Sequence, residues 1–91
     1  MTNEETLEKF REFVNVVYKL RKECPWDREQ THFSLRRCLL EESYEVLEAI
    51  DNNDKNELKK ELGDLILQVI FHSILGEETG DFTLKDVLEG E

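Results

Sequence analysis

The sequence predicts an all-α protein, an antiparallel helical bundle with two long central helices and a short C-terminal helix. Apolar residues recur at helical spacing over long stretches, and no window shows sustained alternation of apolar and polar residues. The 91 residues include only one proline and four glycines, which argues against a loop-rich chain. A chain of this length is expected to form a single domain, residues 1–91.

The first helix is expected over residues 3–22. Leu7 and Phe10 begin a series of apolar residues at three- and four-residue spacing, which is typical of an amphipathic helix. Thr2 and Glu5 have the spacing of a capping box, in which each side chain bonds the backbone of the other. This spacing predicts that the helix begins directly after Thr2.

The stretch KECPWDREQT, residues 22–31, interrupts the helical pattern and is expected to form a turn. Its proline disfavours helical backbone in the residue before it, which is Cys24. A second helix is expected over residues 32–52, with Thr31 as its N-cap.

A third helix is expected over residues 55–78, with Asp54 as its cap. Its later half, LILQVIFHSIL, is apolar on nearly every side, and such a helix must be covered all round. A chain this small has little material for that cover, so we expect a partner subunit in a homodimer. A short fourth helix is expected to begin near Thr83, because Thr83 and Asp86 have capping spacing.

The composition narrows the range of partners and compartments. A formal net charge of −10 repels nucleic acids and anionic membranes, so we expect neither as a partner. An anionic substrate would need a cation between itself and the protein. Two cysteines fit no zinc or redox motif, and no signal peptide or membrane span is recognisable, so a cytoplasmic location is expected.

Two acidic residues of the second predicted helix lie where apolar residues are expected. On a helical wheel, Glu42 falls inside the apolar stripe that contains Leu39 and Val46. Glu45 falls at the edge of the same stripe. A solvated acidic face does not explain a glutamate in line with core positions, since an unpaired buried carboxylate is costly.

The third predicted helix carries a second acidic pair, Glu61 and Asp64, which apolar residues bracket on the wheel. Both pairs have i, i+3 spacing, so each places two carboxylates on one helix face. If the two helices pack antiparallel, the four carboxylates converge and would raise each other's pKa. A hard divalent cation resolves this conflict, and oxygen ligands alone favour Mg²⁺, with Mn²⁺ also suitable.

These residues also fit a known pattern. The motif Glu41-Glu42-x-x-Glu45, followed fifteen residues later by Glu61-Leu-Gly-Asp64, resembles the EExxE…ExxD signature of the MazG family. The stretches CPWDREQTHFSLRRCLLEESYEVLEAI and ELKKELGDLILQVIFHS extend the resemblance over roughly residues 7–88. MazG proteins belong to the all-α nucleoside triphosphate pyrophosphohydrolases.

The resemblance implies a Mg²⁺-dependent enzyme that hydrolyses nucleoside triphosphates to the monophosphate and pyrophosphate, usually as a helical dimer. Water would attack the α-phosphorus with assistance from the metal. Carried over by position, the metal ligands are Glu42, Glu45, Glu61 and Asp64. Glu41 and Glu42 are then the catalytic residues, with Glu41 orienting the water or a metal ligand.

The chain departs from the pattern in one respect. In longer members a basic segment follows the position of LKDVLEGE and contacts phosphate, and this sequence stops at Glu91. Two alternatives stay open: a related dUTP, dCTP or phosphoribosyl-ATP pyrophosphohydrolase, and a non-catalytic metal-binding dimerisation module. The CPWD stretch favours MazG over the related enzymes.

Three further residues are candidates for contact with the substrate. Arg36 and Arg37 lie one to two turns before the acids and either reach phosphate or pair with nearby glutamates. Trp26 either stacks on a base or fills the end of the bundle. The sequence does not identify the base that the site accepts.

Overall fold

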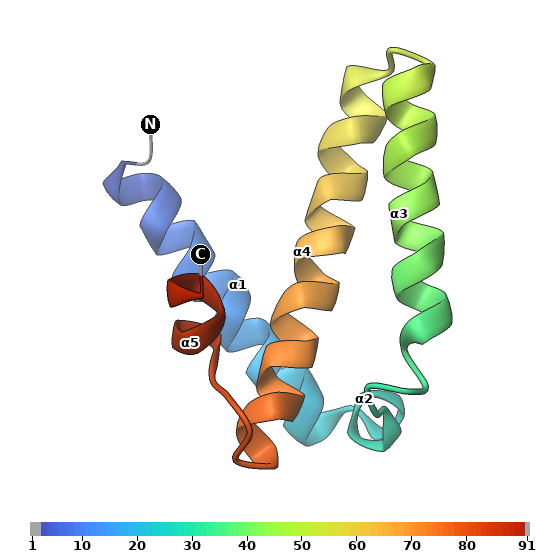
Figure 1. Ribbon diagram of the computed structural model, residues 1–91. Helices are drawn as coiled ribbons and strands as arrows, with labels where there is room; N and C mark the ends of the chain where they lie inside the picture. Colours follow the sequence, from blue (N-terminus) through green and yellow to red (C-terminus); the bar gives the residue numbers. More distant parts are fainter. Residues whose placement is uncertain (1–2, 91) are drawn as a thin grey trace.

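The computed structural model describes residues 3–90, which form five α-helices and contain no β-strand (Figure 1). They are α1 (Glu4–Glu23), α2 (Pro25–Glu29), α3 (Arg36–Asp51), α4 (Lys55–Glu78) and α5 (Leu84–Glu89). The predicted all-α class is therefore confirmed. None of these helices combines the length and the apolar composition that crossing a bilayer requires.

Side-chain caps fix the starts of α4 and α5 where the sequence predicted them. The Asp54 carboxylate accepts a hydrogen bond from the backbone N–H of Glu57 at 3.1 Å. Thr83 and Asp86 form a capping box, in which each side chain accepts from the other residue's backbone N–H. These bonds satisfy N–H groups that a helix start leaves without partners.

The start of α1 differs from the prediction. Asn3 is the N-cap, and its side chain accepts a hydrogen bond from the backbone N–H of Thr6 at 2.9 Å. Thr2, the predicted cap, lies outside the described residues. An asparagine is as good a cap as threonine, so the two neighbouring polar residues competed for the position.

Two further expectations about the following segment are wrong. The predicted turn contains a short helix, α2, which begins at Pro25; proline is well tolerated at a first helical position because its missing N–H would be unpaired there. The next helix begins at Arg36 rather than at residue 32. Thr31 and Ser34 instead exchange backbone-to-side-chain hydrogen bonds in a turn that precedes α3.

Helices α3 and α4 form an antiparallel hairpin (Figure 1). We call residues 35–40 and 67–78, the end away from the connecting turn, the closed end of the hairpin. At this end α1, α5 and the segment that follows α2 surround the two helices. The open end, residues 41–51 and 55–66, leads to the connecting turn and stands clear of the other helices near that turn. Among the five helices, α3 contacts only α4.

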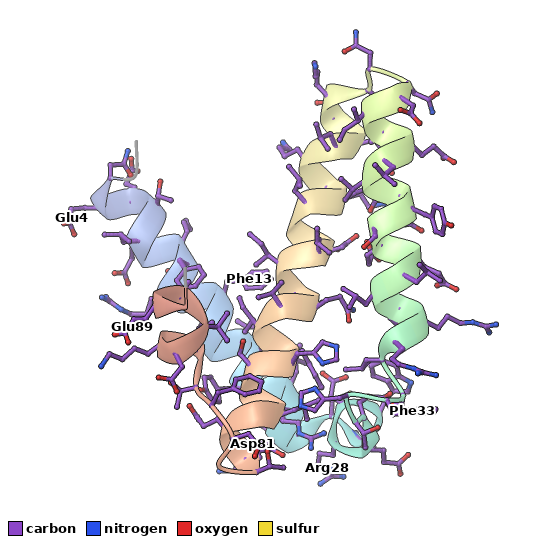
Figure 2. All side chains as sticks on the ribbon, in the orientation of Figure 1. Glu4, Phe13, Arg28, Phe33, Asp81 and Glu89 are labelled. Carbon is purple, nitrogen blue, oxygen red and sulfur yellow. The ribbon has the colours of Figure 1, made fainter. Side chains whose placement is uncertain are left out.

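The hydrophobic core lies at the closed end. It consists of Val17 from α1, Leu35 and four residues of α4: Ile70, Phe71, Ile74 and Leu75. Phe13 of α1 packs against this core from between α1 and α4 (Figure 2). Val17 and Phe13 of α1 thus cover much of the later half of α4 from within the chain, whereas Ile66 and Val69 of the same apolar run are 47% and 44% exposed. The expected partner subunit stays a prediction.

Arg21 joins three segments at the closed end. Its guanidinium donates to both carboxylate oxygens of Glu78 at 2.8 Å, which ties α1 to the end of α4. Its Nη1 also donates to the carbonyl oxygens of Asp27, Arg28 and Gln30 at 2.6, 2.9 and 3.0 Å. These bonds satisfy carbonyl groups at the end of α2 and hold the segment before α3 in place.

Candidate metal centre

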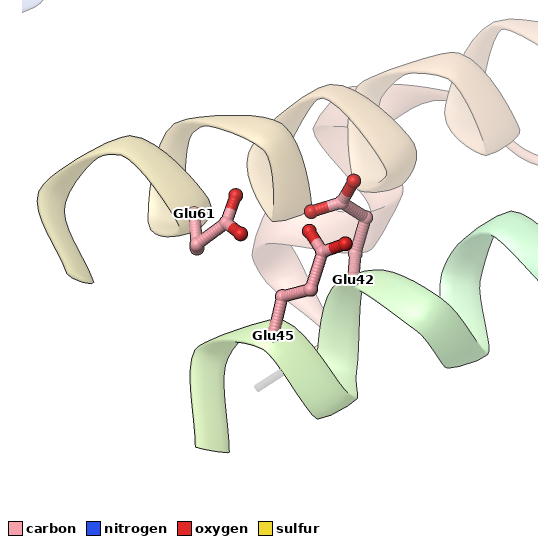
Figure 3. A group of neighbouring side chains, drawn as sticks. All are labelled: Glu42, Glu45 and Glu61. Atoms are coloured by element: carbon pink, nitrogen blue, oxygen red, sulfur yellow. The ribbon is translucent and has the colours of Figure 1, made fainter. Parts of the chain in front are cut away.

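Three glutamates from two helices come together at the open end of the hairpin. Glu42 and Glu45 extend from α3 and Glu61 from α4, and all three point into the space between the helices (Figure 3). One carboxylate oxygen from each lies within 4.8 Å of the others. We call this group the carboxylate cluster. The i, i+3 spacing of Glu42 and Glu45 puts both on the helix face that turns toward α4.

The cluster is partly removed from water. The Glu61 residue is only 5% exposed, Glu42 is half-buried and Glu45 is exposed. The Oε2 atom of Glu42 is buried and has no hydrogen-bond partner among the described residues. A buried carboxylate oxygen without a partner is unfavourable, so this arrangement calls for a proton or a cation.

Burial and the close approach of the carboxylates also raise the pKa values of two members of the cluster. The pKa of Glu61 is raised to about 7 by its side-chain contact with Glu45, by burial and by its contact with Asp64. Burial raises the pKa of Glu42, and the charges of Glu45 and Asp64 raise it further. Both shifts arise because like charges and poor solvation disfavour the ionised form.

Asp64 and Glu41 lie next to the cluster but outside it. Asp64 is half-buried and close enough to raise the pKa of Glu61, yet its oxygens fall outside the group of three that share the 4.8 Å limit. Glu41 is exposed and acts on Glu42 only through its charge. The structure therefore brings three of the four expected ligands together, with the fourth beside them.

The composition of the cluster fits a hard divalent cation. Its donors are all carboxylate oxygens, which suit Mg²⁺ and Mn²⁺ better than softer metals. The buried Oε2 of Glu42 has no hydrogen-bond partner in residues 3–90, so it is free to bind a cation. No histidine or cysteine of residues 3–90 joins the group.

The three candidate substrate residues lie away from the cluster. Trp26 is on α2, and its side chain is largely exposed. The Arg36 guanidinium stacks on the Phe33 ring at 3.9 Å from its centre, on a different side of α3 from Glu42. Neither Arg36 nor Arg37 forms an ion pair within residues 3–90.

Sequence reasoning missed the polar residues that continue along α4 from the cluster. Gln68 lies one turn after Asp64, and His72 one turn after Gln68. The Gln68 Oε1 and His72 Nε2 atoms are buried, and neither has a hydrogen-bond partner in residues 3–90. His72 stacks on His32, with the two Nδ1 atoms 2.7 Å apart. The i, i+4 spacing of 64, 68 and 72 was the available signal.

The fold and the cluster define a class: an all-α protein that presents converging carboxylates between two antiparallel helices. Residues 30–90 match the family model of the MazG nucleotide pyrophosphohydrolase domain. The chain therefore belongs to the MazG family, and the resemblance seen in its motifs is confirmed.

Several curated proteins are similar over most of this chain. It is 49% identical over 81 residues to a nucleoside triphosphate pyrophosphohydrolase/pyrophosphatase MazG of Thermotoga maritima, which covers 87% of this chain and 32% of that protein. It is 46% identical over 84 residues to a Mycobacterium tuberculosis nucleoside triphosphate pyrophosphohydrolase, covering 90% of this chain and 26% of that protein. An uncharacterized Bacillus subtilis protein, YabN, is 47% identical over 83 residues, covering 89% of this chain and 17% of that protein. The chain thus spans about a third or less of each of these relatives.

Proposed function

We propose that this chain hydrolyses nucleoside triphosphates to nucleoside monophosphates and pyrophosphate, with Mg²⁺ held by the carboxylate cluster. The observation that carries the proposal is the convergence of Glu42, Glu45 and Glu61 around a buried carboxylate oxygen with no partner in residues 3–90. The activity in the names of the Thermotoga and Mycobacterium relatives supports the same reaction.

In this proposal Glu42, Glu45 and Glu61 hold the cation, and Asp64 is a fourth ligand from the next turn of α4. The cation would neutralise the crowded carboxylates and polarise the phosphate that is attacked. Without such a charge the cluster would repel a triphosphate, because it is acidic and the whole chain carries a net charge of −10.

The reaction itself requires water and a proton acceptor. Water attacks the α-phosphorus, the bond from this phosphorus to the bridging oxygen breaks, and pyrophosphate leaves with that oxygen. Glu41 is exposed beside Glu42, and its carboxylate is proposed to orient the water and accept its proton. Positioning and charge neutralisation then supply most of the catalysis.

Arg36, Arg37 and Trp26 complete the proposed substrate site. Arg36 and Arg37 are proposed to contact phosphate, because both are cations near the start of the helix that carries the acids. Trp26 is exposed and is proposed to contact the base. For Arg36, contact requires the guanidinium to leave the Phe33 ring on which it stacks.

We further propose that the chain works as a homodimer in the cytoplasm. Leu62, Ile66 and Val69 form an apolar edge of α4 that is 44–47% exposed, next to a cleft between α1 and α4. A second copy would cover this edge, which includes Ile66 and Val69 of the apolar run that the sequence expects a partner subunit to cover. Two free cysteines agree with a reducing compartment.

Pyrophosphate release from a panel of nucleoside triphosphates, with and without Mg²⁺, tests the proposed reaction. We expect Mg²⁺-dependent release, and we expect Glu42→Gln to lower kcat by at least about 100-fold, as loss of a transition-state contact does. Glu12→Gln, the same change at an exposed site on α1, should leave the rate unchanged. If the wild type releases pyrophosphate from none of these nucleotides, the chain is a non-catalytic metal-binding module instead.

A further inference from the structure

A pocket adjoins the carboxylate cluster on the side away from the connecting turn. Its volume is about 280 Å³, near the lower end of the roughly 300–1,000 Å³ that small-molecule sites span. On α3 its lining begins at Leu39, three residues before Glu42, and on α4 at Gln68, four residues after Asp64. These spacings place the two members of each pair on one helix face, so the pocket continues directly from the cluster.

The walls of the pocket are apolar. Leu39, Val69, Phe82 and Val87 line it from α3, from α4 and from the segment that contains α5. Val69 lies at its border with the apolar edge proposed as the dimer contact. Among residues 3–90, no aspartate, glutamate, lysine or arginine lines the pocket. A phosphate or a metal ion would meet no opposite charge here, so the part of a ligand that fits is uncharged and has apolar faces.

Two side chains of α4 add polar atoms to this apolar lining. The Gln68 Oε1 and His72 Nε2 atoms are buried, and neither has a hydrogen-bond partner in residues 3–90, although both residues line the pocket. A buried polar atom without a partner is unfavourable, and a ligand with complementary donors and acceptors would supply the missing bonds. The pocket therefore suits a ligand that carries hydrogen-bonding groups along an edge.

His32 fixes the hydrogen-bonding role of His72. The two rings stack with their centroids 5.0 Å apart and their planes 6° apart, and their Nδ1 atoms are 2.7 Å apart. The Nδ1 atom of His72 is thus already engaged, which leaves only its Nε2 atom for a ligand. Burial lowers the pKa of His72, and the charge of His32 lowers it further, so the neutral ring is favoured.

We propose that this pocket binds the base of the nucleotide, and that Gln68 and His72 hydrogen-bond the edge of that base. The assignment rests on the proposed function, because a triphosphate at the carboxylate cluster determines which part of the substrate reaches the pocket. Of the parts of a nucleotide, only the base combines apolar faces, no charge, and donors and acceptors along an edge. Trp26 does not line the pocket, so its proposed contact involves the part of the base that stays outside.

Pyrophosphate release from nucleoside triphosphates and from ribose 5′-triphosphate, which has no base, tests this assignment. Gln68→Leu removes the amide at nearly the same side-chain size, so kcat/KM for nucleoside triphosphates should fall by about tenfold or more. The value for ribose 5′-triphosphate should stay that of the wild type. Asn56→Leu, which removes an amide at an exposed site of α4, should change neither value. Circular dichroism confirms that the variants keep their helices.

The outcomes separate the pocket from the reaction. If the wild type releases pyrophosphate and Gln68→Leu lowers kcat/KM equally for both kinds of substrate, or for neither, the pocket does not bind the base and the proposed reaction stands. If the wild type releases none, the proposed reaction fails, and the binding of free nucleosides decides about the pocket.

Saturation-transfer NMR with adenosine, guanosine, cytidine and uridine measures this binding without catalysis. These nucleosides have no phosphate, and a chelator removes metal ions, so the carboxylate cluster does not hold them. We expect the base protons of at least one nucleoside to receive saturation from the wild type and from Leu88→Trp, an exposed site outside the pocket. Val87→Trp, which puts a large ring into the pocket lining, should abolish the transfer. No transfer from the wild type to any nucleoside, or equal transfer from Val87→Trp, overturns the inference.

Discussion

The two ends of the α3–α4 hairpin differ in how their side chains are satisfied. At the closed end, Ile70 and Ile74 are no more than 3% exposed, and Arg21 meets the Glu78 carboxylate and three carbonyl groups. At the open end, carboxylates crowd each other, and apolar residues such as Ile66 are about half exposed. The closed end is packed and paired within its own chain, whereas the open end leaves a buried carboxylate oxygen of Glu42 without a partner in residues 3–90 and apolar side chains in water.

This difference predicts unequal effects of the same substitution on α4. Ile70→Ala should lower the free energy of unfolding by about 2–5 kcal/mol, because it removes buried methyl groups and leaves a cavity. Ile66→Ala, one turn earlier on the same helix, should lower it by less than about 1 kcal/mol, since Ile66 is 47% exposed.

Urea denaturation of the two variants measures this contrast. The experiment should use the lowest practicable protein concentration, so that association contributes least to stability. Equal losses for Ile70→Ala and Ile66→Ala would mean that the two ends of the hairpin are equally well packed.

Proton binding by Glu61 at the open end should change the stability of the fold by less than Ile70→Ala does. The folded chain holds the pKa of Glu61 at about 7, above its ordinary value of 4.5. The protonated group therefore favours the folded state fully below pH 4.5, and this contribution is lost as the pH rises through 7. In the metal-free chain the Tm should fall between pH 5 and pH 8.

Glu61→Gln should remove part of this fall, because glutamine does not titrate, and Glu12→Gln should keep all of it. The melting temperatures are to be measured in the presence of a chelator, so that no cation replaces the proton. An equally large fall in Glu61→Gln would show that the shifted pKa has no bearing on folding.

Local signals in the sequence predicted much of the fold. The bounds 55–78 of the third helix are those of α4, and Asp54 and Thr83 cap the helices that they were expected to cap. Such features depend on neighbours in the chain. The position of Glu42 in an apolar stripe likewise predicted a half-buried acid, because helical periodicity alone sets the face on which a residue lies.

Long-range packing could not be predicted in the same way. The sequence shows that the later half of α4 must be covered, but not that Val17 of α1 supplies this cover. Nor does it show that Arg21 holds α2 and the segment before α3, because those contacts join residues that no local pattern relates.

Titration of the metal-free chain with Mn²⁺, followed by electron paramagnetic resonance of the free ion, tests the proposed metal centre most directly. We expect the wild type and Glu12→Gln to bind the ion, Glu61→Gln to bind it much more weakly, and Mg²⁺ to displace it. Glu61 is the most buried member of the carboxylate cluster, so its charge is the least replaceable. Equal binding by the wild type and Glu61→Gln would contradict a metal site between α3 and α4.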